Sequence, residues 1–384
     1  MKQYLYCSIL LLFLACNGIR KEDQAVQILN TVQSTYAPDK RVALFDVSWN
    51  SGVLTGETNL KDAHRELLDK LQANNISFTD SIQILPHSEL GDLNLALVTN
   101  SVANIRREPR HSAELATQAL MGTPLKVLKA EGSWYMVQTP DGYLSWVDAA
   151  GIVRLSRKEM DQWLEKEKVV VTKMIASIYA DESLSEIVSD ITAGNVLELT
   201  ATVPSGYQVT LPDTRSGFIA LEDAVPYEEW KNSRNTNDAS LIQTAKLMMG
   251  SPYLWGGTSP KGMDCSGFTK TIYFLNGMVI PRDASQQIKE GELVDSEKNW
   301  ENLEVGDLLF FGVPESAENS ERVVHVGMWI GDNKFIHSRG RVRISSFDPE
   351  DEHYDAYELN RYLRTKRIRH HPSENVLTVD QVLQ

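Results

Sequence analysis

Cysteine is scarce in this chain. Only three cysteines occur among its 384 residues, and two of them, Cys7 and Cys16, lie in the apolar N-terminal segment. Cys265 is therefore the single cysteine in the rest of the sequence, which excludes internal disulfides and the paired C-x-x-C spacing of structural zinc sites. Any sulfur chemistry of the folded chain must depend on this one thiol.

Positive charge is also in deficit. Lys and Arg number 38 against 52 for Asp and Glu, which leaves a formal net charge of -14 at pH 7. Binding to a polyanion needs a basic stripe, and the sequence contains none, so nucleic acid is excluded as a partner. The length predicts roughly two to four modules of ordinary domain size.

A long apolar run occurs at the N-terminus. Residues 5–15 follow Lys2 and are too few to cross a membrane as a mature helix, so residues 1–16 are predicted to be a secretory signal peptide. We therefore expect export to the periplasm or cell envelope. The segment from Phe13 to Cys16 resembles a bacterial lipoprotein signal, in which Cys16 would carry a lipid anchor, although an aliphatic residue normally stands at Phe13. An ordinary signal peptide is the alternative.

Cys265 follows a glycine-rich loop. Phe268, Ile272 and Leu275 recur after it at helical spacing, whereas the glycines and the proline before it exclude a regular helix. Cys265 therefore falls in the first turn of a helix, with Asp264 as its N-cap. Unpaired amides and the helix dipole at this position favour the thiolate. The pattern predicts a nucleophile presented at a helix start.

A thiolate needs a proton acceptor, and two histidines downstream are placed to supply one. Residues 323–330 and 334–338 read as strands of a hairpin, with His325 on the first and His337 on the second.

The hairpin register decides whether these imidazoles cooperate, because side chains alternate between the faces of a strand. With a three-residue loop Ile330 pairs with Lys334, so His337 lies opposite Gly327 and shares a face with His325. With a two-residue loop, His337 would lie on the opposite face from His325. We predict the three-residue loop, with the two histidines at the diagonal spacing of roughly 7 Å.

Other interpretations of these residues remain open. A lone cysteine is more often a small core side chain than a nucleophile. Cys265, His325 and His337 could also ligate zinc, but a structural zinc site needs a fourth ligand. Arg282 and Asp283 are expected to pair with each other at the surface, without a catalytic role.

Several segments of residues 239–370 together resemble the NlpC/P60 cysteine peptidases of bacterial cell-wall metabolism. The matching segments are Y-x-W-G-G at 253–257, D-C-S-G-F at 264–268, P-R-D-A-S-Q-Q at 281–287, G-D-L-L-F-F at 306–311 and H-V-G-M at 325–328. The resemblance implies an α+β, papain-like domain, in which a helix bearing the cysteine packs on an antiparallel sheet bearing the histidines. It makes Cys265 the nucleophile, His325 the general base, His337 the residue that orients the His325 ring, and Tyr253 a group near the oxyanion.

An internal repeat precedes this domain. Short β-rich runs punctuated by Gly, Pro and Asp recur in residues 99–155 and again in residues 168–227. Both copies resemble bacterial SH3-like domains, and we expect two small β-barrels. The remaining segments are an N-terminal α/β segment (22–98), a linker (228–238) and a loosely attached polar tail (371–384).

The resemblance also implies a substrate site. Relatives with this architecture place the segment 112–118 over the catalytic cleft, so Glu114 and Tyr143 are expected to bind the N-terminal ammonium of the substrate together with Asp264. Carboxylates suit this task, because a partly buried cation needs charge-assisted hydrogen bonds. Ser266 and Ser285 are expected to contact the substrate.

The activity implied by the resemblance is hydrolysis of the γ-D-glutamyl bond to a diamino acid, diaminopimelate or lysine, in peptidoglycan stem peptides with a free N-terminal L-Ala. No metal or organic cofactor is implied, and we expect a monomer. A hydrolase of intact murein that uses the SH3-like domains as tethers is the main alternative. A binding protein or an acyltransferase on the same fold is another.

Overall fold

The computed structural model describes residues 21–382. The predicted signal peptide and the anchor at Cys16 therefore lie outside the described residues. Within this range, no helix has the length and apolar character needed to span a membrane. The chain forms two units, of which the first contains the described residues up to Gly91 with Leu128–Ala130 and Gly142–Leu144, and the second contains the rest.

The first unit is built on a three-stranded sheet. Strands β1 (Phe45–Asn50) and β2 (Val53–Thr58) are antiparallel, and β2 is parallel to β3 (Thr79–Ile84) through the crossover helix α2 (Lys61–Ala73). Residues 21–36 form a further helix. Apolar residues of both helices are buried in one core, which includes Ala25, Leu29, Val32, Ala63, Leu67 and Leu71.

The first SH3-like region forms a seven-stranded sheet in the order β10-β4-β7-β8-β9-β5-β6. Its strands are β4 (Leu95–Val98), β5 (Val102–Arg106), β6 (Leu115–Leu120), β7 (Pro124–Glu131), β8 (Trp134–Gln138), β9 (Leu144–Asp148) and β10 (Ile152–Leu155). The order runs in a line between β10 and β6, so the expected closed barrel is wrong. The edge strand β6 instead meets the cysteine-bearing region, where Gln118 O accepts a hydrogen bond from Thr258 Oγ1 at 3.1 Å.

The second SH3-like region repeats this topology. Its order is β13-β12-β16-β15-β14-β11-β17, which matches the first order strand for strand when read from the other end, and this sheet is also open. The strands are β11 (Lys168–Val171), β12 (Ile175–Tyr179), β13 (Ile187–Thr192), β14 (Val196–Val203), β15 (Gly206–Thr210), β16 (Ser216–Ala220) and β17 (Ala224–Pro226). Helix α3 (Arg157–Leu164) joins the regions and begins with a capping box of Ser156 and Glu159.

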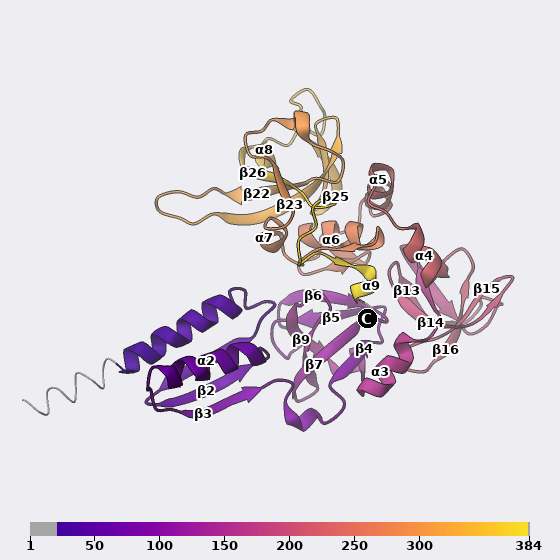
Figure 1. Cartoon of the computed structure of the whole chain (residues 1–384). Helices are drawn as coiled ribbons and strands as arrows, with labels where there is room; N and C mark the ends of the chain where they lie inside the picture. Colours follow the sequence, from indigo (N-terminus) through magenta and orange to yellow (C-terminus); the bar gives the residue numbers. More distant parts are fainter. Residues whose placement is uncertain (1–20, 383–384) are drawn as a thin grey trace, which may run out of the picture. The chain divides into compact units, whose positions relative to one another are not determined.

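The cysteine-bearing region is mixed α+β and packs helix α6 (Cys265–Leu275) on an antiparallel sheet of order β21-β26-β22-β23-β24-β25 (Figure 1). The sheet strands are β21 (Glu292–Asp295), β22 (Leu308–Val313), β23 (Arg322–Gly331), β24 (Lys334–Arg339), β25 (Arg341–Ser346) and β26 (Tyr362–Arg367). The smaller elements are α5 (Asp238–Leu247), β18 (Thr258–Ser259), β19 (Gly262–Met263), β20 (Met278–Val279), α7 (Ala284–Gln287) and α8 (Ala356–Asn360). Phe268 and Ile272 of α6 share a buried core with Val326 and Met328 of β23, which holds the helix against the sheet.

Two connecting segments are more ordered than the sequence predicts. Part of the expected linker is helix α4 (Tyr227–Ser233), which buries Trp230. The tail is not loosely attached, because β27 (Leu377–Thr378) pairs with β20 and helix α9 (Val379–Val382) follows it. Val379 is buried in the same cluster as Trp230, and this apolar contact explains the attachment.

Candidate active site

Cys265 is the first residue of α6, as predicted. Asp264 is its N-cap, and the Asp264 carboxylate accepts hydrogen bonds from the amides of Gly267 at 2.7 Å and Gly256 at 3.0 Å. The cap satisfies one of the free amides of the first turn and ties the glycine-rich loop to the helix. Cys265 is buried, with 8% of its surface exposed.

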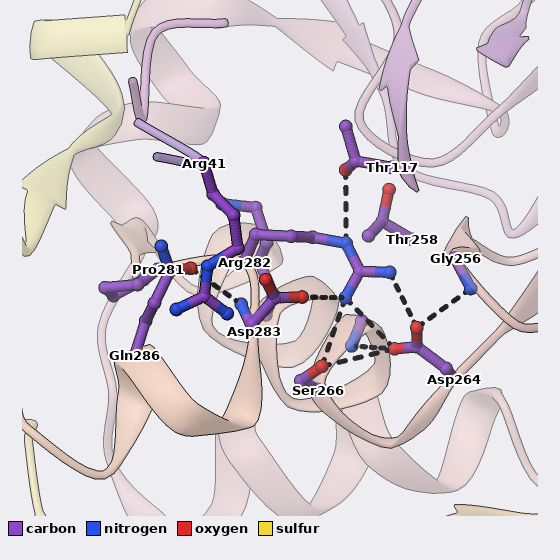
Figure 2. A network of polar contacts seen from close by, with 12 residues as sticks. Arg41, Thr117, Gly256, Thr258, Asp264, Ser266, Pro281, Arg282, Asp283 and Gln286 are labelled. Atoms are coloured by element: carbon purple, nitrogen blue, oxygen red, sulfur yellow. Dashed lines mark hydrogen bonds and ion pairs between the residues drawn. The ribbon is translucent and has the colours of Figure 1, made fainter. Parts of the chain in front are cut away.

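Arg282 organises the start of α6, a role that the sequence analysis missed (Figure 2). Its guanidinium is 1% exposed and donates to both Asp264 oxygens, at 3.1 and 2.6 Å. It also donates to Ser266 Oγ at 3.1 Å and to Thr117 Oγ1 of β6 at 3.2 Å. The predicted pair with Asp283 is present, with charged atoms 4.0 Å apart, but its expected place at the surface is wrong because Arg282 is buried. A buried guanidinium needs several acceptors, and Asp264 supplies two of them.

The histidine hairpin has the predicted shared face of His325 and His337 but not the predicted loop. Gly331 pairs with Lys334, so the loop has two residues, Asp332 and Asn333, with φ of 53° and 55°. The three-residue loop is therefore wrong. A register shift between Trp329 and Gly331, a β-bulge, compensates for the one-residue difference in loop length.

As a result, Met328 pairs with Ile336 and the next position brings Gly327 beside His337, as expected. The shared face is confirmed, because His325 Nε2 and His337 Nδ1 are 2.7 Å apart. A Cβ atom on Gly327 would lie 3.2 Å from the His337 Cβ. The absence of a side chain at residue 327 leaves room for the ring contact.

A buried carboxylate lies beside the histidine pair. Glu358 is fully buried, and its Oε1 is 3.8 Å from His325 Nε2. Its oxygens also bind Arg339 at 3.1 Å and Arg361 at 2.8 Å. His325, His337 and Glu358 converge closely enough to ligate a metal ion, and Cys265 is not in this group. The surrounding guanidinium groups disfavour a cation, so the arrangement suits proton transfer better than metal binding.

Burial dominates the electrostatics of the reacting groups. Burial, with the charge of Asp264 as the second cause, raises the pKa of the Cys265 thiol to about 12, and hydrogen bonds from the backbone amides of Val326 and Ser266 act against this shift. Burial also lowers the pKa of His325 to about 3, and Arg361 and other guanidinium groups act in the same direction. Burial therefore opposes the helix start, which was expected to favour the thiolate. These two shifts favour the neutral forms of the thiol and the imidazole, and a neutral imidazole can accept a proton.

Tyr253 lies beside this thiol. Burial raises the pKa of Tyr253, and repulsion from the ionised forms of Cys265 and Asp264 raises it as well. The phenol therefore keeps its proton and is a hydrogen-bond donor, as a group near an oxyanion must be. Its backbone amide donates to Gly340 O at 3.0 Å, which anchors the residue to the loop between β24 and β25.

The two predicted serines occupy different surroundings. Ser266 is buried in the Arg282 network, where its hydroxyl donates to Asp264 at 3.3 Å. Ser285 lies half-buried in the short helix α7. The charge of Asp264 is compensated by Arg282, so the structure assigns Asp264 and Ser266 a structural task. Their contacts with substrate remain predictions.

The first SH3-like region reaches the loop that precedes Cys265. Glu114 Oε1 accepts a hydrogen bond from Trp255 Nε1 at 2.6 Å, and its Oε2 is 2.7 Å from Arg107 Nε. Gln118 accepts hydrogen bonds from Thr258 N at 2.9 Å and Ser259 Oγ at 3.0 Å. The segment that resembles the cleft-covering one thus contacts the cysteine-bearing region.

Tyr143 directly precedes β9 and is buried. Its segment belongs to the first unit, whereas Cys265 belongs to the second. A role of Tyr143 in substrate binding stays a prediction.

A thiol at the start of a helix, packed on an antiparallel sheet that carries a hydrogen-bonded histidine pair, defines a cysteine peptidase. Residues 250–367 match the model of the NlpC/P60 family, and residues 105–152 match the bacterial dipeptidyl-peptidase Sh3 domain. The chain belongs to the NlpC/P60 family. The second SH3-like region lies outside both matched ranges.

Relatives of known name and structure share this architecture. The chain is 34% identical over 233 residues to the gamma-D-glutamyl-L-lysine dipeptidyl-peptidase of Bacillus cereus, which covers 59% of this chain and 67% of the relative. It is 32% identical over 232 residues to the Bacillus subtilis protein of the same name, with 58% and 72% covered. The crystal structure of a NlpC/P60 family protein from Bacillus cereus is similar with a TM-score of 0.62 and 27% identity, over 72% of this chain and 99% of that one.

Proposed function

We propose that this cysteine peptidase hydrolyses the γ-D-glutamyl bond to diaminopimelate or lysine in peptidoglycan stem peptides that begin with a free L-Ala. The observation that carries the proposal is the Glu114 carboxylate, which is partly exposed and bonded to Trp255 in the loop before Cys265. An accessible carboxylate there suits an ammonium group of the substrate. The names of the relatives from Bacillus cereus and Bacillus subtilis support this substrate class.

Cys265 is the proposed nucleophile and His325 the general base. The Sγ–H bond breaks as its proton moves to the His325 ring, and the sulfur electron pair attacks the γ-glutamyl carbonyl carbon. Tyr253 and the amides at the start of α6 stabilise the resulting oxyanion. When the C–N bond breaks, the leaving amine takes the proton from His325 and a thioester remains on Cys265. Water then attacks the thioester carbonyl as its proton moves to His325. The C–S bond breaks, and the sulfur takes that proton back from His325, which restores the thiol.

His337 orients the base in this scheme. Its Nδ1 lies 2.7 Å from His325 Nε2, so this nitrogen of His325 is engaged and its Nδ1 takes the thiol proton in this scheme. The arrangement corresponds to a papain-like site, in which a third polar residue positions the catalytic imidazole.

The setting that we propose is the cell envelope. The predicted signal peptide would export the chain to the periplasm or envelope, and Cys16 would anchor it if the lipoprotein signal is used. Free stem peptides of L-Ala, γ-D-Glu and a diamino acid are its proposed partners, and the enzyme is expected to act as a monomer.

Product analysis by mass spectrometry tests the proposed function. The substrates are L-Ala-γ-D-Glu-diaminopimelate, its lysine analogue, the N-acetylated forms and whole sacculi, with Cys265→Ala as the matched inactive variant. We expect L-Ala-γ-D-Glu and the free diamino acid from the unblocked peptides only. Cleavage that persists in Cys265→Ala would contradict the assigned nucleophile. Equal rates on blocked peptides or sacculi would instead favour a hydrolase of intact murein.

A further inference from the structure

A chain of buried polar groups continues behind His337. His337 Nε2 lies 3.0 Å from Ser345 Oγ on β25, and Ser345 Oγ donates to Asp355 Oδ2 at 3.1 Å. Asp355 caps α8 through a bond of 3.1 Å from the Glu358 amide to its Oδ1. His337, Ser345 and Asp355 are all buried, so each hydrogen in this chain has few possible partners.

The Asp355 carboxylate determines the direction in which the hydrogen bonds of this series are donated. Asp355 is paired with Arg339 and Arg343, each at 3.2 Å, and an ionised carboxylate only accepts hydrogen bonds. The single hydrogen of Ser345 therefore points to Asp355, and its oxygen accepts from His337 Nε2–H.

The tautomers of both rings follow from this direction. A neutral imidazole with hydrogen on Nε2 has a lone pair on Nδ1. His337 Nδ1 thus accepts from His325 Nε2–H across the 2.7 Å contact, and the free lone pair of His325 is on its Nδ1. Glu358 Oε1, 3.8 Å from His325 Nε2, favours hydrogen on the same nitrogen.

A competing donor makes Ser345 and Asp355 necessary. Arg343 Nε lies 3.4 Å from His337 Nε2 and can only donate. If Arg343 were the partner of that nitrogen, His337 Nε2 would accept and its Nδ1–H would donate to His325 Nε2. The remaining hydrogen of the His325 ring would then be on Nδ1. The Ser345 contact is shorter, and Asp355 holds the Arg343 guanidinium through its NH2 group. The remaining charge near both rings is Arg361, which is bound to Glu358.

We infer that Ser345 and Asp355 are positioning residues that fix the direction of this hydrogen-bond chain, so that His325 offers an unprotonated Nδ1 to the Cys265 thiol. The inference rests on the proposed function, in which His325 takes that proton. When the proton arrives, His325 becomes an imidazolium with hydrogen on both nitrogens. Asp355 keeps its charge throughout, and the proton leaves from Nδ1 to the departing amine.

Nitrogen NMR of the full chain with ¹⁵N-labelled histidine tests the inference directly, because ring ¹⁵N shifts distinguish protonated from unprotonated nitrogens. His325→Asn and His337→Asn assign the signals. We expect unprotonated Nδ1 on both rings of the unaltered protein. Ser345→Ala removes the acceptor and leaves Arg343 as the neighbour of His337 Nε2, so both tautomers should reverse. Ser345→Thr keeps the hydroxyl and should keep the tautomers.

Kinetics give the second measurement. Loss of a correctly protonated general base should lower kcat of Ser345→Ala by about 100-fold at little change in KM, whereas Ser345→Thr stays near the unaltered enzyme. The double change Ser345→Ala with Arg343→Met removes the competing donor and should restore the original tautomer and part of kcat.

Hydrogen on His325 Nδ1 in the unaltered protein, or unchanged tautomers and kcat in Ser345→Ala, would overturn the inference. The ¹⁵N shifts of His325 and His337 in the unaltered protein test the inference even if a variant fails to fold. Failure of the proposed function would be seen separately, as peptide cleavage by Cys265→Ala.

Discussion

Trp255 Nε1 donates a hydrogen bond of 2.6 Å to Glu114 Oε1, and the two residues are 141 positions apart in the chain. The bond joins the first SH3-like region to the loop that leads to Cys265. It gives the SH3-like region a direct contact with the catalytic domain, beyond the spacing or wall attachment that such domains could provide.

The Glu114 contact predicts a selective loss of activity. Glu114→Gln keeps an oxygen for Trp255 but removes the charge proposed to bind the substrate ammonium. A charge-assisted hydrogen bond contributes about 1.5–3 kcal/mol, so kcat/KM for the free tripeptide should fall roughly 10- to 100-fold. The exposed Glu108→Gln is the matched control and should have no effect. An equal fall on N-acetylated peptide, measured on any residual cleavage, would show that Glu114 supports the loop rather than the ammonium.

The Arg282 network predicts a stability effect. Arg282→Met leaves the Asp264 carboxylate buried without its cation, which should destabilise the fold by about 3–5 kcal/mol. Arg110→Met, at an exposed arginine, should change stability by no more than about 1 kcal/mol. Urea unfolding of both variants measures the difference. Similar values for the two would contradict the importance of the buried pair.

The tight contact at Gly327 predicts an effect on catalysis. A Cβ there would lie 2.9 Å from Phe335 Cδ2 and 3.2 Å from His337 Cβ. Gly327→Ala should therefore displace the His337 ring, cost about 1–3 kcal/mol of stability and reduce kcat. Gly331→Ala is the control, since its Cβ would meet nothing within 4 Å and its strain comes only from φ of +90°. It should lower stability while leaving kcat intact. Loss of kcat in both variants would point to hairpin distortion instead.

The histidine pair predicts loss of stability in acid. Burial lowers the pKa of His325 to about 3, and burial with the charge of His325 lowers the pKa of His337. Between the unfolded pKa of about 6.5 and these lower values the unfolded chain binds more protons, so stability falls as pH falls. Each histidine adds a slope of at most about 1.4 kcal/mol per pH unit. Urea unfolding from pH 7 to pH 5 should show a shallower slope for His337→Asn than for the unaltered protein. Parallel slopes would contradict the burial argument.

Local features of the site could be predicted from the sequence. Asp264 as N-cap and the buried stripe of Phe268, Ile272 and Leu275 lie within a few turns of Cys265, where the chain itself sets the spacing. The shared face of His325 and His337 was predicted from strand alternation, but only for a three-residue loop that the structure does not have. The β-bulge that makes a two-residue loop compatible with this face has no marker in the sequence.

Contacts between distant segments could not be predicted in this way. Arg282 lies 18 residues from Asp264 and 165 from Thr117, so only folding brings its acceptors together. Ser345 and Asp355 attract no notice as sequence, since a serine and an aspartate are common on surfaces. Because they are buried next to His337, they can set the direction of its hydrogen bonds.

The sequence by itself determined that this chain has one thiol at a helix start and two histidines on one hairpin, because both patterns are set by short-range geometry. Only the tertiary structure decided the protonation of these groups. Burial in the folded domain removes water from Cys265 and His325, and this desolvation opposes the effect of the helix start. Burial therefore favours the neutral forms of both groups, and the hydrogen bonds of the histidine pair influence which ring nitrogen carries the proton.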